Sequence, residues 1–173
     1  MKLIELLGQI SVQSIQGSME TEILELTTDS RQVKKGTLFI AVKGTKVDGN
    51  EFIEKAIAAG AVAIVSEYSP QQSVSVVWIQ VEDATAAVGW IAAGFYRNPS
   101  ASLKVTGVTG TNGKTTIATL LYKLFTRRGY VCGLISTVEN RIGDQVIPAT
   151  HTTPDAINLQ LLLFQMKNAG CTH

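Results

Sequence analysis

Cysteine is scarce in this chain, which excludes two common classes of small protein. Among 173 residues only Cys132 and Cys171 occur, one in an apolar stretch and one near the chain end. The two do not have C-x-x-C spacing, so the sequence indicates neither a disulfide framework nor a cysteine-based zinc site. Intracellular proteins rarely depend on disulfides. We therefore expect a cytoplasmic protein in a reducing environment.

Excess charge and long apolar runs are also absent. The chain has 15 basic and 14 acidic residues, so its net charge of +1 gives no electrostatic reason to expect nucleic acid. The longest apolar run, residues 57–65, is far shorter than the roughly 20 residues of a membrane helix. Glu5 and Gly8 interrupt the N-terminus before a signal-peptide core could form. We expect no membrane anchor, and small polar or anionic ligands as partners; the sequence does not indicate an oligomeric state.

Glycine, lysine and threonine gather in one stretch after a strand predicted over residues 103–108. The stretch reads Gly110-Thr111-Asn112-Gly113-Lys114-Thr115-Thr116. Glycines allow positive φ and a close approach of backbone N–H groups to an anion, and a following helix N-terminus favours negative charge. The pattern predicts a loop for the phosphates of ATP. Lys114 would contact the β- and γ-phosphates, and the Thr115 hydroxyl would bind Mg²⁺.

This loop departs from the common G-x-x-x-x-G-K-[ST] spacing, because Val108 occupies the position of the first glycine. The shorter G-x-x-G-K-T-T pattern remains. A helix is expected from Thr116 to about Arg128, with an apolar face at residues 117, 120, 121, 124 and 125 and Gly129 as its C-cap. The alternative interpretation is a glycine-rich turn that leads into an ordinary helix.

The residues before the loop alternate between strand and helix patterns. Strands are expected at 23–28, 37–42, 61–65 and 74–81, and helices at 51–59 and 84–96. The first two strands are expected to form a hairpin through Lys34-Lys35-Gly36. The segment 97–100 has the composition of a domain linker. The sequence predicts an α/β fold: a small N-terminal α/β domain over 1–98, then over 101–173 the first part of a P-loop-type ATPase domain with a parallel sheet.

A strand at 131–135 after the loop helix is expected to run parallel to Val105 through a right-handed crossover. A small hairpin with its turn at 141–144 follows, and a helix is expected over 156–168. Before that helix stands Thr150-His151-Thr152-Thr153-Pro154-Asp155. Thr153 is expected to cap the helix, with Pro154 at its first position. His151 is expected to be a polar surface residue.

Three segments resemble one enzyme family. The loop 110–116 resembles the ATP loop of the Mur ligases and their folylpolyglutamate synthetase relatives. Asp29-Ser30-Arg31, followed by Gly36, Leu38-Phe39, Ala41 and Gly44, is similar to the opening of the Mur ligases that add the third residue or the terminal dipeptide of the peptidoglycan peptide. Residues 152–155 resemble the T-T-P-D segment of the third-residue enzymes. Without this resemblance, Asp-Ser-Arg would be interpreted as a solvated turn. The family commonly has D-G-H where this chain has Asp48-Gly49-Asn50.

The resemblance implies an ATP-dependent amide-bond-forming ligase with ATP and Mg²⁺ as cofactors. Its substrates would be UDP-N-acetylmuramoyl-L-alanyl-D-glutamate and a diamino acid, meso-diaminopimelate or L-lysine, joined through an acyl phosphate. Ser30 would contact the uridine-diphosphate end of the precursor, and Thr152 and Thr153 would hold its muramoyl part. Lys114 would be catalytic, and Thr115 would bind the metal. Two alternatives remain open: the ligase that adds the terminal D-Ala-D-Ala dipeptide, and a nucleotide-binding module without chemistry.

Phosphoryl-transfer sites of this kind need an acidic residue at the end of a neighbouring strand. No predicted strand after the loop ends in such a residue. The resemblance therefore implies that this acid, a modified lysine and the amino-acid-binding domain lie outside the sequence. We expect an N-terminal fragment that is inactive by itself.

Overall fold

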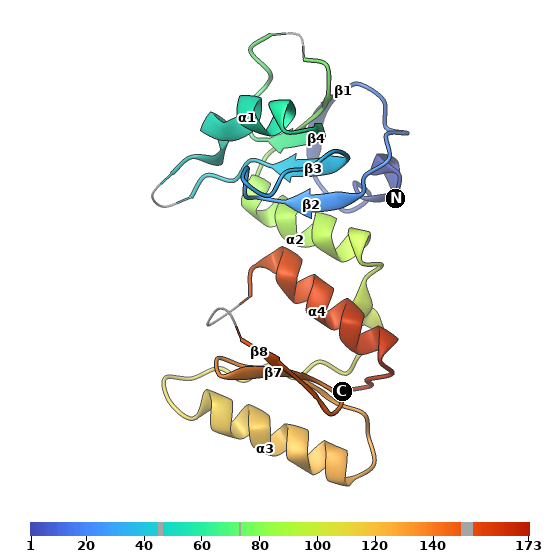
Figure 1. Cartoon of the computed structure of the whole chain (residues 1–173), viewed down its shortest axis with the longest axis vertical. Helices are drawn as coiled ribbons and strands as arrows, with labels where there is room; N and C mark the ends of the chain where they lie inside the picture. The colour runs from blue at the N-terminus through green and yellow to red at the C-terminus, as the bar shows by residue number, and fades with distance from the viewer. Residues whose placement is uncertain (45–46, 73, 150–153) are drawn as a thin grey trace. The chain divides into compact units, whose positions relative to one another are not determined.

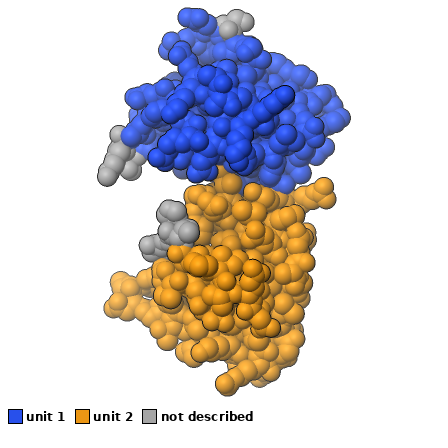
Figure 2. All heavy atoms as spheres, viewed as in Figure 1, with its two compact units in different colours: residues 1–95 blue, residues 96–173 orange. Residues whose placement is uncertain are grey.

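The computed structural model describes residues 1–44, 47–72, 74–149 and 154–173. The chain forms two compact units, Met1–Phe95 (unit 1) and Tyr96–His173 (unit 2), which Figure 2 shows in separate colours. Each unit contains both strands and helices, as expected for an α/β chain.

Unit 1 is built on a five-stranded sheet with the order β1-β5-β4-β3-β2 (Figure 1). Strands β2 to β5 run parallel to one another, and β1 pairs antiparallel with β5 at the edge. The strands are β1 (Val12–Gln16), β2 (Glu25–Thr27), β3 (Thr37–Ile40), β4 (Ala61–Ser66) and β5 (Val77–Val81). The helices are the short 3-10 turns η1 (Leu3–Glu5) and η2 (Gly49–Phe52), then α1 (Ile53–Ala58) and α2 (Ala84–Phe95).

The predicted hairpin between the first two of these parallel strands is wrong, because β2 and β3 run in the same direction. All four residues of β3 are buried, which is the pattern of a strand covered on both faces in a parallel sheet. The segment between β2 and β3 returns to the same end of the sheet, so both strands begin side by side. There, just before the two strands, Leu24 N donates to Gly36 O at 2.9 Å. Strand β1 was not predicted, since its sequence VQSIQ is mostly polar and its side chains are exposed or half-buried.

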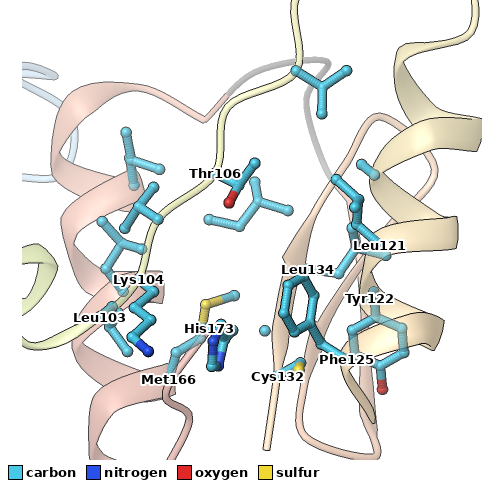
Figure 3. A pocket seen from close by; sticks show the side chains of 17 residues that line it. Leu103, Lys104, Thr106, Leu121, Tyr122, Phe125, Cys132, Leu134, Met166 and His173 are labelled. Atoms are coloured by element: carbon cyan, nitrogen blue, oxygen red, sulfur yellow. The ribbon is translucent and has the colours of Figure 1, made fainter. Parts of the chain in front are cut away.

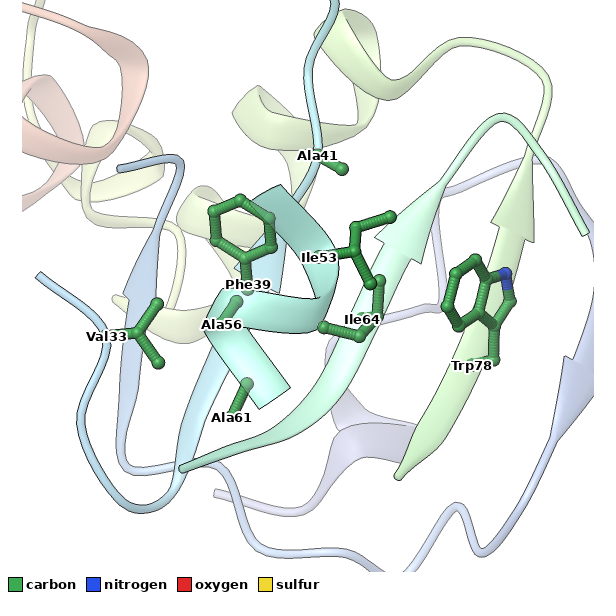
Figure 4. Close-up of a cluster of buried hydrophobic side chains, with 8 residues drawn as sticks. All are labelled: Val33, Phe39, Ala41, Ile53, Ala56, Ala61, Ile64 and Trp78. Atoms are coloured by element: carbon green, nitrogen blue, oxygen red, sulfur yellow. The ribbon is translucent and has the colours of Figure 1, made fainter. Parts of the chain in front are cut away.

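The core of unit 1 forms where α1 packs on the sheet. Phe39, Ile64 and Trp78 are register neighbours on three adjacent strands and share one face. Figure 4 shows these side chains gathered with Ile53 and Ala56 of α1. Full burial of each large apolar side chain stabilises the fold by about 1.5–3 kcal/mol. Helix α2 covers the opposite face of the sheet (Figure 1), with its alanine-rich side buried.

Unit 2 combines a three-stranded antiparallel meander with two long helices. Its elements are η3 (Pro99–Ser102), α3 (Lys114–Arg127), β6 (Gly133–Ile135), β7 (Glu139–Ile142), β8 (Gln145–Pro148) and α4 (Ala156–Asn168). Figure 1 shows the meander between α3 and α4. The predicted hairpin is confirmed, because β7 and β8 pair antiparallel on either side of Gly143. Ile142, Leu163, Met166 and Cys171 form its core cluster. Burial raises the pKa of the Cys171 thiol, as expected for a structural cysteine.

The strand predicted over residues 103–108 is not formed, since residues 104–109 have no strand structure. Lys104 N donates to Thr172 O at 2.9 Å, and Thr172 N donates to Val131 O at 2.9 Å. The backbone of Thr172 thus lies between the segment of Val105 and β6. The expected parallel strand pair of Val105 and residues 131–135 is therefore not formed. The intervening backbone of Thr172 satisfies backbone groups on both sides.

Candidate functional site

The loop of residues 110–113 has the backbone geometry that an anion site requires. Gly110 has φ of 149° and Gly113 has φ of 78°, conformations that residues with a side chain rarely adopt. A Cβ added at Gly113 would meet nothing within 4 Å, so its backbone conformation, not packing, requires glycine there. Helix α3 begins directly after Gly113, which has no side-chain cap. The first backbone N–H groups of a helix lack intrahelical partners and carry its positive dipole end.

Lys114 folds back over this loop. Its Nζ donates to Gly110 O at 2.5 Å and to Thr111 O at 3.2 Å. The lysine is exposed, so its ammonium group can exchange these carbonyl partners for a bound anion without breaking a packed core. The arrangement places one cation, two glycines and a helix N-terminus around one position. This is the environment of a phosphate group.

Thr115 contributes a hydroxyl to the same region. Its Oγ1 lies 3.1 Å from Oγ1 of Thr137, a residue that follows β6 with only Ser136 between. Thr137 was missed by the sequence reasoning. The signal that could have found it is its place just beyond the carboxyl end of the strand predicted over residues 131–135, which was expected to run parallel to Val105. Oxygen donors of this type suit Mg²⁺. Among the described residues, no three Asp, Glu, His or Cys side chains come together as a metal site.

An apolar hollow of about 300 Å³ lies next to the loop but is not the phosphate site. Figure 3 shows it between α3, the segment of residues 103–108 and β6. Leu121, Phe125, Leu134 and Met166 line it, and no residue of the loop 110–116 does. Lys104, Thr106, Tyr122 and His173 also border the hollow, but most of its lining is apolar, which suits a phosphate poorly.

Ser30 belongs to unit 1. It lies in a turn that is stabilised by hydrogen bonds of the neighbouring residues Asp29 and Arg31. Asp29 accepts hydrogen bonds from the backbone N of Arg31 at 2.9 Å and from its guanidinium at 2.7–3.1 Å. These bonds lower the pKa of Asp29 from 3.8 to about 2. Thr27 Oγ1 also accepts a hydrogen bond from Asp29 N at 3.0 Å. Ser30 is therefore presented, half-buried, by a fixed turn.

Asn50 occupies the position where the Mur ligases commonly have histidine. Its side chain makes hydrogen bonds within unit 1. Its side chain donates to Asp48 Oδ1 at 2.7 Å and accepts from Ser66 Oγ at 2.7 Å. Asp48 also caps η2 by accepting from Asn50 N. The side-chain amide of Asn50 thus connects the start of η2 with Ser66 at the end of β4.

The predicted substrate residues Thr152 and Thr153, and His151 beside them, lie outside the described residues. The expected cap of the following helix is wrong, because Asp155 occupies the N-cap of α4 and accepts from Asn158 N at 2.9 Å. Aspartate is as good a cap as threonine or better, and it stands one residue before the first helical turn.

None of the helices in the described part of the chain has the length and apolar character needed to span a bilayer.

Two family models match the chain. Residues 22–96 match the model described as "Mur ligase family, catalytic domain", and residues 108–173 match "Mur ligase middle domain". Together the matches span most of the chain.

Individual relatives agree with these models. The chain is 50% identical over 175 residues to the UDP-N-acetylmuramoyl-L-alanyl-D-glutamate--2,6-diaminopimelate ligase of Cytophaga hutchinsonii, covering 100% of this chain and 36% of the relative. A solved structure of a ligase of the same name matches with a TM-score of 0.74 and 28% identity, over 99% of this chain and 34% of the other. A Thermotoga maritima MurF ligase solved in complex with ADP matches with a TM-score of 0.53 and 27% identity, over 83% and 29% of the two chains. The chain, which spans about a third of the length of these relatives, belongs to the Mur ligase family.

Proposed function

We propose that this chain is the precursor- and ATP-binding part of an ATP-dependent ligase. A protein of the relatives' length would add a diamino acid, meso-diaminopimelate or L-lysine, to UDP-N-acetylmuramoyl-L-alanyl-D-glutamate. The observation that carries the proposal is Lys114 folded over a glycine loop at the N-terminus of α3. The names of relatives at about 50% identity support diaminopimelate as the added amino acid.

The loop residues would bind the phosphates of ATP, as the ADP complex of a structural neighbour supports. Residues 110–116 contribute backbone N–H groups, Lys114 a charge and Thr115 a hydroxyl. The oxygen atoms near Thr115 fit Mg²⁺, which when bound would neutralise charge on the phosphates. The chain's own contribution is fixed before ATP arrives, because the loop backbone already has the required φ angles.

In the proposed reaction the γ-phosphoryl group of ATP passes to the D-glutamyl carboxylate, which gives an acyl phosphate and ADP. The amine of the diamino acid then attacks the acyl carbon, and inorganic phosphate leaves as the amide forms. The first step brings two anions together, so Lys114 and the N–H groups of the loop lower its barrier by stabilising the shared negative charge.

The remaining site residues are proposed from the resemblance. Residues 1–98 would bind the precursor and residues 101–173 the nucleotide. Ser30 would contact the uridine-diphosphate end, which its position in a fixed turn supports. Thr152 and Thr153 would contact the muramoyl part.

Titration calorimetry tests the nucleotide assignment. Lys114→Ala should weaken ATP binding about 10- to 150-fold, because a charge-assisted contact contributes about 1.5–3 kcal/mol. Lys123→Ala is the matched control, since this lysine is exposed on the same helix and should leave the affinity unchanged. Equal ATP affinity in the folded Lys114 variant would contradict the proposal.

A second titration tests the precursor assignment separately. Ser30→Ala should weaken binding of UDP-N-acetylmuramoyl-L-alanyl-D-glutamate by roughly 2- to 12-fold, the range of one neutral hydrogen bond. The same variant should keep its ATP affinity. A loss of ATP binding with unchanged precursor binding would reverse the roles given to the two units.

A further inference from the structure

Thr115 and Thr137 bring two hydroxyl groups together from separate elements. Thr115 lies in the first turn of α3, and Thr137 follows the end of β6, yet their Oγ1 atoms are 3.1 Å apart. Both residues are accessible to solvent, Thr115 half-buried and Thr137 exposed. A hydrogen bond between two such hydroxyls contributes little by itself in contact with water. Their juxtaposition beside the phosphate loop therefore suggests a ligand.

The residues around Thr137 hold it in place. Ser136 Oγ donates to Glu139 O at 2.7 Å, and Ser136 N donates to Oδ1 of the buried Asn140 at 3.3 Å. Val138 N and Glu139 N also donate to Ser136 Oγ, at 3.4 and 3.3 Å. Thr137 thus sits in a turn whose backbone is held by its neighbours on both sides.

The spacing of the two oxygens is compatible with both binding the same cation. Mg²⁺ binds oxygen at 2.0–2.1 Å in octahedral geometry, which places adjacent ligand oxygens roughly 2.9 Å apart. Ca²⁺ binds at 2.3–2.6 Å, which would place them roughly 3.3–3.7 Å apart at right angles. The observed 3.1 Å lies between the two values, so the choice of Mg²⁺ rests on the nucleotide and not on this distance. Mg²⁺ commonly takes few protein ligands and completes its shell with phosphate oxygens and water.

On these grounds we infer that the Thr137 hydroxyl is a second protein oxygen, beside Thr115, for the Mg²⁺ ion that accompanies the nucleotide. The inference rests on the proposed binding of ATP at the loop and adds a residue to it. Thr137 connects the carboxyl end of β6 with the metal, so that ion binding couples this strand end to α3.

The test compares the ADP affinity of the 173-residue chain in excess Mg²⁺ with its affinity in EDTA, by titration calorimetry. In the unchanged chain Mg²⁺ should strengthen ADP binding. Thr137→Val keeps the side-chain shape and removes the hydroxyl, and it should reduce this Mg²⁺ enhancement about tenfold. Thr137→Ser should restore it. Thr126→Val, at an exposed position near the other end of α3, should leave it unchanged.

Two results would overturn the inference in different ways. If Thr137→Val weakens ADP binding equally with and without Mg²⁺, then Thr137 only positions Thr115 and does not bind the ion. If its Mg²⁺ enhancement equals that of the unchanged chain, Thr137 has no role at the metal. Failure of the unchanged chain to bind ADP under either condition would instead remove the proposed function, and the inference with it. Circular dichroism of each variant establishes that the fold is retained.

Discussion

Units 1 and 2 differ in how their helices are packed. In unit 1 both faces of a five-stranded sheet are covered, and α2 buries six of its residues. In unit 2 no residue of α3 is buried, and Ile117, Leu120 and Leu124 of its apolar face are each about half exposed or more. The proposed phosphate loop leads directly into this loosely packed helix. Binding segments are often drawn from the less stable parts of a fold, where ligand contacts can add order.

The first prediction addresses the packed side of this comparison. Phe39→Ala should destabilise unit 1 by about 3–5 kcal/mol, because Phe39 is fully buried between the sheet and α1. Leu120→Ala in α3 should change the stability of unit 2 by about 0.5 kcal/mol or less, since this leucine is 60% exposed. Urea denaturation followed by circular dichroism measures both. Similar losses in the two variants would show that α3 is packed as tightly as the core of unit 1.

The second prediction compares glycines in the two units. Gly113→Ala should cost about 1–2 kcal/mol and weaken ADP binding, because φ of 78° is unfavourable for alanine. Gly89→Ala in α2 should instead stabilise unit 1 by about 0.5–1 kcal/mol, as there is open space around it and a helix favours alanine. Thermal unfolding with and without ADP measures both effects. An unchanged ADP affinity in Gly113→Ala would contradict the loop geometry.

The third prediction concerns the contact between α3 and the meander. The Tyr122 hydroxyl donates to Gly143 O at 2.8 Å in a partly buried setting. Tyr122→Phe should therefore destabilise unit 2 by about 1 kcal/mol. Tyr68→Phe is the control, because Tyr68 is 52% exposed in unit 1 and should change little. If the Tyr122 variant behaves like its control in chemical denaturation, this hydrogen bond does not hold α3 in place.

The smallest effect is expected at the turn that carries Ser30. The pKa of Asp29 is lowered from 3.8 to about 2, so ionised Asp29 stabilises the folded state above pH 4, and this contribution is lost as the pH falls from 4 to 2. Because the ion pair with Arg31 lies at the surface, Asp29→Asn should cost less than about 1 kcal/mol at pH 7. The stability difference between wild type and variant should shrink toward zero at pH 2. A difference that stays constant with pH would show that the carboxylate charge is not involved.

The sequence predicted most of the elements of unit 1, because its strands are apolar runs bounded by turn residues. It did not predict the direction of β3, since a buried four-residue strand looks the same in a hairpin and in a parallel sheet. Strand β1 was missed because an edge strand needs few apolar residues. At α4, two neighbouring residues were both suitable caps, and the local sequence could not rank Thr153 against Asp155.

At the candidate site, the glycines and Lys114 were identifiable from the sequence because their chemistry is concentrated in one short loop. Thr137 was not, since its partner Thr115 is 22 residues away and only the crossover between α3 and β6 brings them together. The strand predicted at residues 103–108 shows the same limitation. Its β-branched residues favour a strand, but its pairing depends on the distant backbone of Thr172.

Hydrogen exchange of the loop amides, measured by mass spectrometry or NMR with and without ADP and Mg²⁺, tests the central claim most directly. The N–H groups at the start of α3 have no intrahelical partners and should exchange rapidly in the free chain. With ADP and Mg²⁺ in excess, exchange at residues 110–117 should slow by about tenfold or more, while β3 and β4 of unit 1 remain unchanged. Slowed exchange confined to unit 1, or none at residues 110–117, would contradict the assignment of the nucleotide to this loop.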